Sequence, residues 1–210
     1  DLLRYVVDVE NRLGCRANLI LSCSGEDMHR FNRIYEFPLE KMCVLPNGVM
    51  AFSENTMQRP RKNAARRKLG IKENCFLAVF IGSPYGPNLE AAEFICENLA
   101  PALPETLFVI AGGVGSQITC DTKNVLLTGA LDEKGKRDWL SAADIAVNPM
   151  FSGSGTNIKM FDFMAYALPV VTTSTGARGI ETGSGKPFLV VPPDREAFVQ
   201  AVQNLRDEEL

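Results

Sequence analysis

A short glycine-containing stretch is the part of this sequence best suited to chemistry. It reads Gly153-Ser-Gly-Thr-Asn-Ile-Lys159, and the apolar residues before and after it predict a strand, a turn and a helix in that order. Small residues let backbone N–H groups converge, and a helix N-terminus adds about half a positive charge. We therefore expect anionic oxygens, above all those of phosphates, to bind at this turn without a metal ion.

The helix predicted to follow the turn, over residues 157–167, carries little polar surface. At 100° per residue, Lys159, Asp162 and Tyr166 form a narrow polar edge on an otherwise apolar helix. A lysine and an aspartate on a mostly buried helix are expected to face a ligand or a cleft. The alternative is a surface ion pair between Lys159 and Asp162, worth roughly 0.3 kcal/mol. The turn just upstream favours ligand binding.

Alternating strands and helices must position this turn. From residue 64 onward the apolar runs predict strands at 76–81, 107–111, 125–128, 145–147, 169–173 and 188–191. Helices are expected between them, the first with Asn88 as its N-cap and the last from Arg195. The alternation predicts an α/β fold, a Rossmann-like parallel sheet with helices on both faces.

The first 47 residues form a smaller unit. Helices are predicted at 2–12, ending near Gly14, and at 26–35, with strands at 18–22 and 42–45. Two strands cannot bury a two-layer core, so we expect residues 1–47 to be the terminal βαβ piece of a larger N-terminal domain. Residues 48–63 are expected to be a linker and 64–210 a complete domain. The absence of an initiator Met agrees with a fragment.

Composition excludes several functions. Among 210 residues, 22 are basic and 25 acidic, a net charge of −3 that gives no support for nucleic-acid binding. The six cysteines lack Cys-x-x-Cys spacing and His29 is the single histidine, so we expect no metal site and no histidine-based catalysis. Free thiols indicate a reducing compartment. Gly112-Gly-Val-Gly115 does not complete a dinucleotide-binding motif, so no cofactor is expected.

The run from Arg59 to Lys68 holds six of the basic residues. A solvated helix start near the linker is the expected role. The functional alternative is contact between this basic run and an anionic membrane surface. Arg178, in Thr175-Gly-Ala-Arg-Gly179, has two readings that stay open: a residue that stabilises its loop, or one that reaches a ligand.

Short motifs along the chain occur together in an order that resembles a known family. They are Pro46-Asn-Gly-Val49, Phe80-Ile-Gly82 followed by Pro87-Asn88, Ile110-Ala-Gly-Gly113, Leu127-Thr-Gly129, Ala143-Asp144, Gly153-Ser-Gly-Thr-x-x-Lys159 and Leu168-Pro-Val-Val171. Over residues 18 to 205 or so, the sequence resembles the GT-B glycosyltransferases of the family 4 type. The resemblance implies two facing Rossmann-like domains, of which the C-terminal one binds a nucleotide-sugar donor.

The resemblance also implies roles for individual residues. The donor phosphates and sugar would bind at Gly153, Ser154, Gly155, Thr156, Asn157 and Lys159, with the lysine replacing a divalent metal. Asp162 would bind the ribose, Gly129, Ala130 and Leu131 the base, and Gly82, Ser83 and Asn88 would face the interdomain cleft. Two departures from the family stand out: Ser154 and Asp162 occupy the positions of its two glutamates, and its Arg and Lys after the Phe-x-Gly strand are absent.

The function implied is transfer of a hexose from a nucleotide-diphosphate donor, with retention of configuration, to a sugar, lipid-linked or polysaccharide acceptor. The acceptor and any catalytic base would belong to the rest of the N-terminal domain, so we expect no catalytic residue here and no activity from these 210 residues alone. A cytoplasmic location is expected, free or peripheral at the inner face of the membrane. The alternatives are a sugar-nucleotide epimerase of the same build and a non-catalytic nucleotide-binding module.

Overall fold

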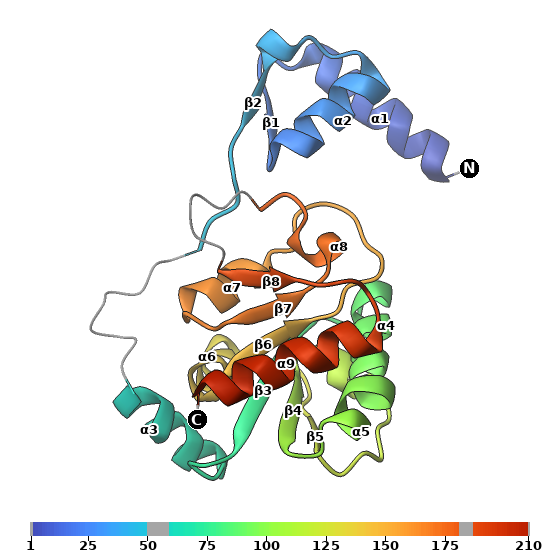
Figure 1. Ribbon diagram of the computed structural model, residues 1–210. Helices are drawn as coiled ribbons and strands as arrows, with labels where there is room; N and C mark the ends of the chain where they lie inside the picture. Colours follow the sequence, from blue (N-terminus) through green and yellow to red (C-terminus); the bar gives the residue numbers. More distant parts are fainter. Residues whose placement is uncertain (1, 50–58, 181–186, 210) are drawn as a thin grey trace.

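The structure, a computed structural model, describes residues 2–49, 59–180 and 187–209 (Figure 1). Its first part contains two helices and two strands with a short 3-10 turn: α1 (Leu2–Arg16), β1 (Ile20–Ser22), α2 (Gly25–Tyr35), η1 (Leu39–Lys41) and β2 (Met42–Val44). Strands β1 and β2 pair in parallel, as a βαβ unit requires. Ser24 caps α2, because its hydroxyl accepts a hydrogen bond from the backbone N–H of Asp27.

The expectation that the first helix ends near Gly14 is wrong. Helix α1 continues through Gly14 to Arg16. A Cβ at Gly14 would lie 2.1 Å from the nearest ring atom of Phe37, so this glycine leaves room for the buried Phe37 ring. The glycine is therefore explained by close packing between two segments and not by a helix stop.

The second part of the chain forms one parallel sheet in the order β5-β4-β3-β6-β7-β8. Its strands are β3 (Phe76–Ile81), β4 (Thr106–Ala111), β5 (Val125–Leu127), β6 (Ile145–Asn148), β7 (Val170–Thr172) and β8 (Phe188–Val190). The predicted doubly wound α/β fold is confirmed. Strand order reverses between β3 and β6, and open sheets of this kind bind ligands beyond the carboxyl ends of the strands at such a switch point.

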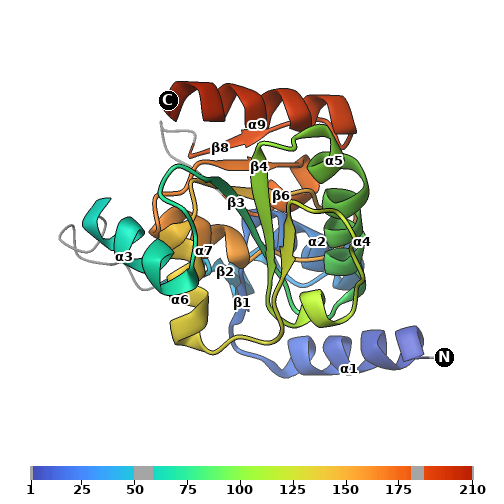
Figure 2. The same ribbon diagram turned by 90° about the horizontal axis from the view of Figure 1, so that it is seen from below.

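Helices cover both faces of this sheet. They and the short turns are α3 (Arg59–Leu69), α4 (Gly86–Phe94), the π-turn η3 (Ile95–Leu99), α5 (Ala100–Ala102), η4 (Gly113–Ser116), α6 (Glu133–Ala142), α7 (Lys159–Ala165), α8 (Ser174–Ala177) and α9 (Arg195–Glu209). Figure 2 shows α9 on one side of the sheet and α6 and α7 on the other. Alternate residues of β3 divide between the faces: Ala78 and Phe80 enter one core, Leu77 and Val79 the other.

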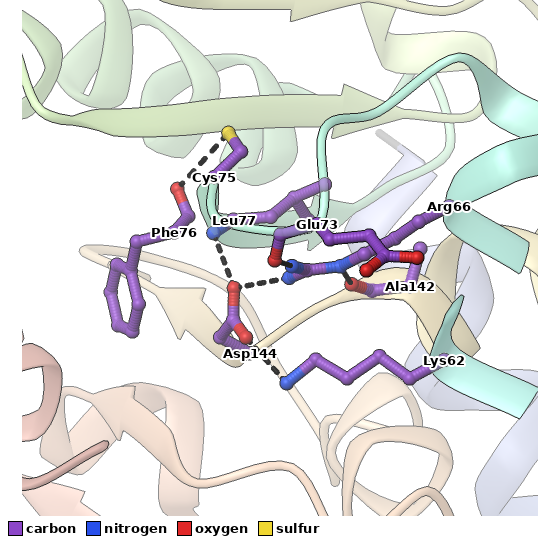
Figure 3. Close-up of polar contacts among 8 residues, drawn as sticks. All are labelled: Lys62, Arg66, Glu73, Cys75, Phe76, Leu77, Ala142 and Asp144. Atoms are coloured by element: carbon purple, nitrogen blue, oxygen red, sulfur yellow. Dashed lines mark hydrogen bonds and ion pairs between the residues drawn. The ribbon is translucent and has the colours of Figure 1, made fainter. Parts of the chain in front are cut away.

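The basic helix α3 differs from its predicted role. It begins at Arg59, so residues 59–63 of the predicted linker are helical, while residues 50–58 lie outside the described part. The expectation of a solvated basic run is wrong at Arg66, which is 3% exposed. Its Nη2 bonds Asp144 Oδ2 at 2.6 Å, and its Nε and Nη1 donate to the carbonyls of Ala142 (2.9 Å) and Glu73 (2.6 Å) (Figure 3).

Asp144 completes this buried network. Its Oδ2 also accepts from the backbone N–H of Leu77 at 2.6 Å, and its other oxygen pairs with Lys62 (Figure 3). Every polar atom of the pair therefore has a partner, which a buried ion pair requires. The network fixes α3 against the amino-terminal edge of the sheet, the edge opposite to the switch point.

All six cysteines lie in the described residues and are free, as predicted. No helix in the described part of the chain is long and apolar enough to cross a bilayer.

Candidate functional site

A cavity of about 390 Å³ opens at the carboxyl ends of β3 and β6, the switch point of the sheet. Three loops line it, those after β3, β6 and β7. The lining residues are Ile81, Gly82, Ser83, Tyr85, Asn88, Met150, Ser152, Gly153, Ser154, Gly155, Thr156, Asn157, Ile158, Lys159, Thr175 and Arg178. The structure thus brings together the nine residues expected to contact the donor phosphates and sugar or to face the cleft.

The turn after β6 depends on two glycines. Gly153 has a φ of +125° and Gly155 a φ of +71°, backbone conformations that side chains with a Cβ rarely adopt. Helix α7 begins at Lys159, two residues later than predicted, which lengthens the turn. Next to Gly155, the buried hydroxyl of Thr156 has no hydrogen-bond partner among the described residues. The turn therefore combines a backbone conformation that favours glycine with a buried hydroxyl that has no hydrogen-bond partner in the described part of the chain.

Lys159 lies at the start of α7 with its ammonium inside the cavity wall. Its Nζ donates to Asn88 Oδ1 at 2.6 Å and lies 4.2 Å from the centre of the Phe80 ring. Ring contact stabilises the charged form, yet burial lowers the pKa of Lys159 from 10.5 to about 7. No carboxylate in the described residues pairs with this lysine. A bound anion would supply the charge partner that the ammonium lacks.

Asn88 does not cap the helix, contrary to the prediction. Helix α4 begins at Gly86 with Tyr85 at the N-cap, which places Asn88 in the first turn. Its Nδ2 donates to the carbonyl and the hydroxyl of Ser83, at 3.1 and 3.3 Å. Its oxygen accepts from Lys159, so Asn88 connects the loop after β3 with the lysine across the cavity.

Arg178 reaches the cavity from the third loop. It follows α8, and its guanidinium donates to backbone carbonyls of the glycine turn: Nη2 to Gly153 (3.0 Å) and Gly155 (3.1 Å), and Nε to Gly155 at 3.4 Å. Among the described residues, no carboxylate pairs with Arg178. The side chain therefore stabilises the loop and lines the cavity at once.

The charge of the cavity is positive. Lys159 and Arg178 line it, and no aspartate or glutamate does among the residues that the structure describes. Glu90 lies nearby on α4, where its carboxylate accepts a hydrogen bond of 2.6 Å from the Ser152 hydroxyl. Two cations without carboxylate partners around a glycine turn suit a phosphate-bearing ligand.

Asp162 and the loop at residues 129–131 lie outside this cavity lining. Asp162 pairs at 2.8 Å with Lys136 of α6, the helix that directly follows that loop. Asp162 thus pairs with the helix that follows residues 129–131, and Leu131 packs in the core on the side of the sheet that α7 covers. Because Lys159 and Asp162 take different partners, the alternative of an ion pair between them is wrong.

A second cavity, of about 570 Å³, lies at the opposite edge of the sheet around Arg66 and Asp144. It is larger, but its lining carries both signs of charge: Lys62, Arg66 and Arg206 against Glu73, Glu105 and Asp144. Lys62 and Arg66 already pair with Asp144, so this cavity does not favour an anion. Among the described residues, no cluster of three or more His, Cys, Asp or Glu could hold a metal ion.

Comparison with known proteins places this geometry in context. The family described as glycosyl transferases group 1 matches residues 76–208. TuaC of Bacillus subtilis (strain 168), provisionally assigned as a glycosyltransferase of teichuronic acid biosynthesis, is 28% identical over 169 residues, 80% of this chain and 42% of TuaC. The chain therefore spans less than half the length of that relative.

Solved structures with the same fold include two whose ligands or names bear on the site. Anabaena HepE, in complex with UDP and glucose, is 18% identical with a TM-score of 0.73, covering 99% of this chain and 57% of HepE. Sucrose-phosphate synthase from Thermosynechococcus elongatus is 17% identical with a TM-score of 0.72, covering 99% of this chain and 53% of the synthase. The fold of the chain is that of GT-B glycosyltransferases.

Proposed function

Because the chain belongs to the glycosyl transferases group 1 family, we propose that its cavity binds the diphosphate of a nucleotide-sugar donor. The whole protein would transfer the sugar to an acceptor. One observation carries the proposal: within the described part of the chain, the lining of the cavity at the switch point has two cationic side chains and no carboxylate. A diphosphate matches that charge better than any neutral ligand does.

The residues of the cavity would divide the work as follows. Gly153, Ser154, Gly155, Thr156 and Asn157 form the turn that receives the phosphates and the sugar. Lys159 supplies a charge-assisted hydrogen bond, and so stabilises the diphosphate as it leaves without help from a divalent metal. Gly82, Ser83 and Asn88 form the opposite wall and hold the lysine in place.

The nucleoside would extend from this cavity along α6. Asp162 would accept hydrogen bonds from the ribose hydroxyls, and Gly129, Ala130 and Leu131 would contact the base. Asp162 pairs with Lys136, a contact that a ribose would share or displace. HepE was solved with UDP, which makes UDP the first nucleotide to try.

Sugar transfer would require more than the donor site. Transfer of a hexose with retention, to a sugar, lipid-linked or polysaccharide acceptor, would need the rest of an N-terminal Rossmann-like domain. Residues 1–47 would be its last βαβ piece. The epimerase alternative would use the same donor site without an acceptor, and a binding module would use it without turnover.

Helix α3 bears on the proposed cytoplasmic location with peripheral contact at the membrane. Helix α3 carries the basic run, but Arg66 faces the sheet, and Arg67 and Lys68 pair with Glu73 and Asp138. Paired charges attract an anionic surface less than free ones do. Binding to anionic vesicles that is lost in a variant with both Arg67 and Lys68 reversed to Glu would support the contact.

A thermal-shift panel tests the donor proposal. UDP, GDP, ADP and CMP, with the matching nucleotide sugars, are compared on the purified chain. A ligand present at 100 times its Kd stabilises the folded chain by about 2.7 kcal/mol. We expect the nucleoside diphosphate of one base to raise the melting temperature by the amount that corresponds to such a stabilisation. Equal melting temperatures with every nucleotide at millimolar concentration would contradict the proposal.

A further inference from the structure

Arg178 combines hydrogen bonds to the glycine turn with a place in the cavity lining. It belongs to the loop after β7, whereas Lys159 begins α7, yet both side chains line the cavity. The two cations thus approach the same space from different elements. The sequence lacks basic residues directly after the Phe-x-Gly strand at Gly82, and Arg178 is the second cation among the described residues of the lining.

The guanidinium is held in place before any ligand arrives. Bonds from Nε and Nη2 to the carbonyls of Gly153 and Gly155 use one edge of its planar fork. The two N–H groups of Nη1 have no partner among the described residues. Because an arginine keeps its charge at any pH at which proteins fold, the glycine turn carries a fixed positive charge that no described carboxylate neutralises.

Charge and geometry together suggest what this group recognises. A guanidinium with free donors prefers phosphate oxygens, and a contact of that kind is stronger than a neutral hydrogen bond. A diphosphate brings one phosphate group for each of the two cations, whereas a monophosphate has a single group for both. The second cation therefore adds a reason for the cavity to prefer two linked phosphates over one.

We infer that Arg178 is a second phosphate-binding residue, which acts with Lys159 to make the cavity select diphosphates over monophosphates. The inference rests on the proposed donor function and names the residue that discriminates at the same site. The alternative is a purely structural role, in which Arg178 only stabilises the glycine turn through its hydrogen bonds to the carbonyls of Gly153 and Gly155. The two readings differ in what loss of the side chain does to mono- and diphosphates.

Titration calorimetry separates the two readings. UDP and UMP (or the base selected by the thermal-shift panel), with inorganic pyrophosphate and phosphate as base-free probes, are titrated into wild type, Arg178→Gln and Arg178→Lys. Arg195→Gln is the matched control, because it removes the same charge from the exposed first residue of α9. Circular dichroism and melting temperature check that each variant is folded.

We expect Arg178→Gln to weaken diphosphate and pyrophosphate binding about tenfold to hundredfold, and monophosphate binding less than threefold. Arg178→Lys keeps the charge without the fork and should fall between wild type and Arg178→Gln; if the Gln variant does not fold, this one decides. An equal loss for mono- and diphosphates, or no loss, would overturn the inference and leave the structural role. Failure of the wild type to bind any nucleoside diphosphate would instead refute the donor proposal.

Discussion

The lowered pKa of Lys159 predicts that anion binding at the cavity depends on pH. Burial lowers the pKa of Lys159 to about 7, against 10.5 for a solvated lysine. A bound diphosphate would restore the charge by pairing with it, and so raise the pKa in the complex. Above pH 7 the free protein has lost this proton and must take it up again to bind. Affinity should therefore fall as the pH rises.

The size of the effect follows from the shift. A lowering by this amount corresponds to roughly 5 kcal/mol in favour of the neutral amine, at about 1.36 kcal/mol per pH unit. If the complex keeps the lysine protonated throughout, the apparent Kd rises tenfold for each pH unit above 7. Between pH 7.5 and 9.5 the loss is about a hundredfold, or ~2.7 kcal/mol. The ligand contributes little there, because phosphate monoesters lose their second proton near pH 6, with pKa about 6.

Calorimetry over this pH range, in buffers of different ionisation enthalpy, measures both the affinity and the protons taken up. About half a proton should be taken up at pH 7 and nearly one at pH 9. Lys159→Arg is the matched control, since a guanidinium stays charged and should make the affinity flat above pH 7.5. Lys159→Met should be flat and weaker. A wild-type Kd that is the same at pH 7.5 and 9.5, with no proton uptake, would refute the reasoning.

Three further predictions concern the scaffold that positions the cavity. Arg66→Met leaves the buried Asp144 without its arginine partner, and should lower the free energy of unfolding by about 3–5 kcal/mol in urea denaturation. The control Arg67→Met alters an exposed residue and should change the free energy of unfolding by less than about 0.5 kcal/mol. Gly115→Ala places a Cβ 2.2 Å from the carbonyl oxygen of Thr128 and should lower the free energy of unfolding by about 1–3 kcal/mol. In the control Gly86→Ala the added Cβ has no atom within 4 Å, so no measurable loss of stability is expected in thermal melting. Phe163→Ala empties a fully buried site between α7 and the sheet, so a loss of about 3–5 kcal/mol is expected in the same denaturation assay, and a loss below about 1 kcal/mol would contradict the packing described.

Patterns of apolar residues predicted the sheet well. The strand at 76–81 has the predicted bounds, because its apolar run, buried at residues 77–80, is bounded by a polar turn on one side and Gly82 on the other. The glycine turn could also be predicted from sequence, because small residues before an apolar helix let backbone N–H groups converge at the helix N-terminus. Local patterning is sufficient where one element sits in a uniform environment.

Residues whose roles depend on distant partners could not be predicted in this way. Arg66 lies in a basic run and reads as solvated, yet it meets Asp144, 78 residues away. Asn88 reads as a cap because its local pattern suits one, but its partner Lys159 is 71 residues distant. Arg178 stayed open between two roles because the carbonyls that hold it belong to the turn on another loop. Tertiary contact, and not propensity, decides such positions.

The most direct test of the account is the place where a diphosphate binds. Backbone amide resonances of the isotope-labelled chain are followed by NMR while UDP, or the diphosphate selected by the thermal-shift panel, is added. We predict that the largest shifts fall at the carboxyl-terminal edge of the sheet, at Gly82, Gly155 and Lys159, and that residues around Asn74 at the opposite cavity stay unchanged. Shifts centred on the cavity around Arg66 and Asp144, or no shifts at saturating nucleotide, would contradict the account.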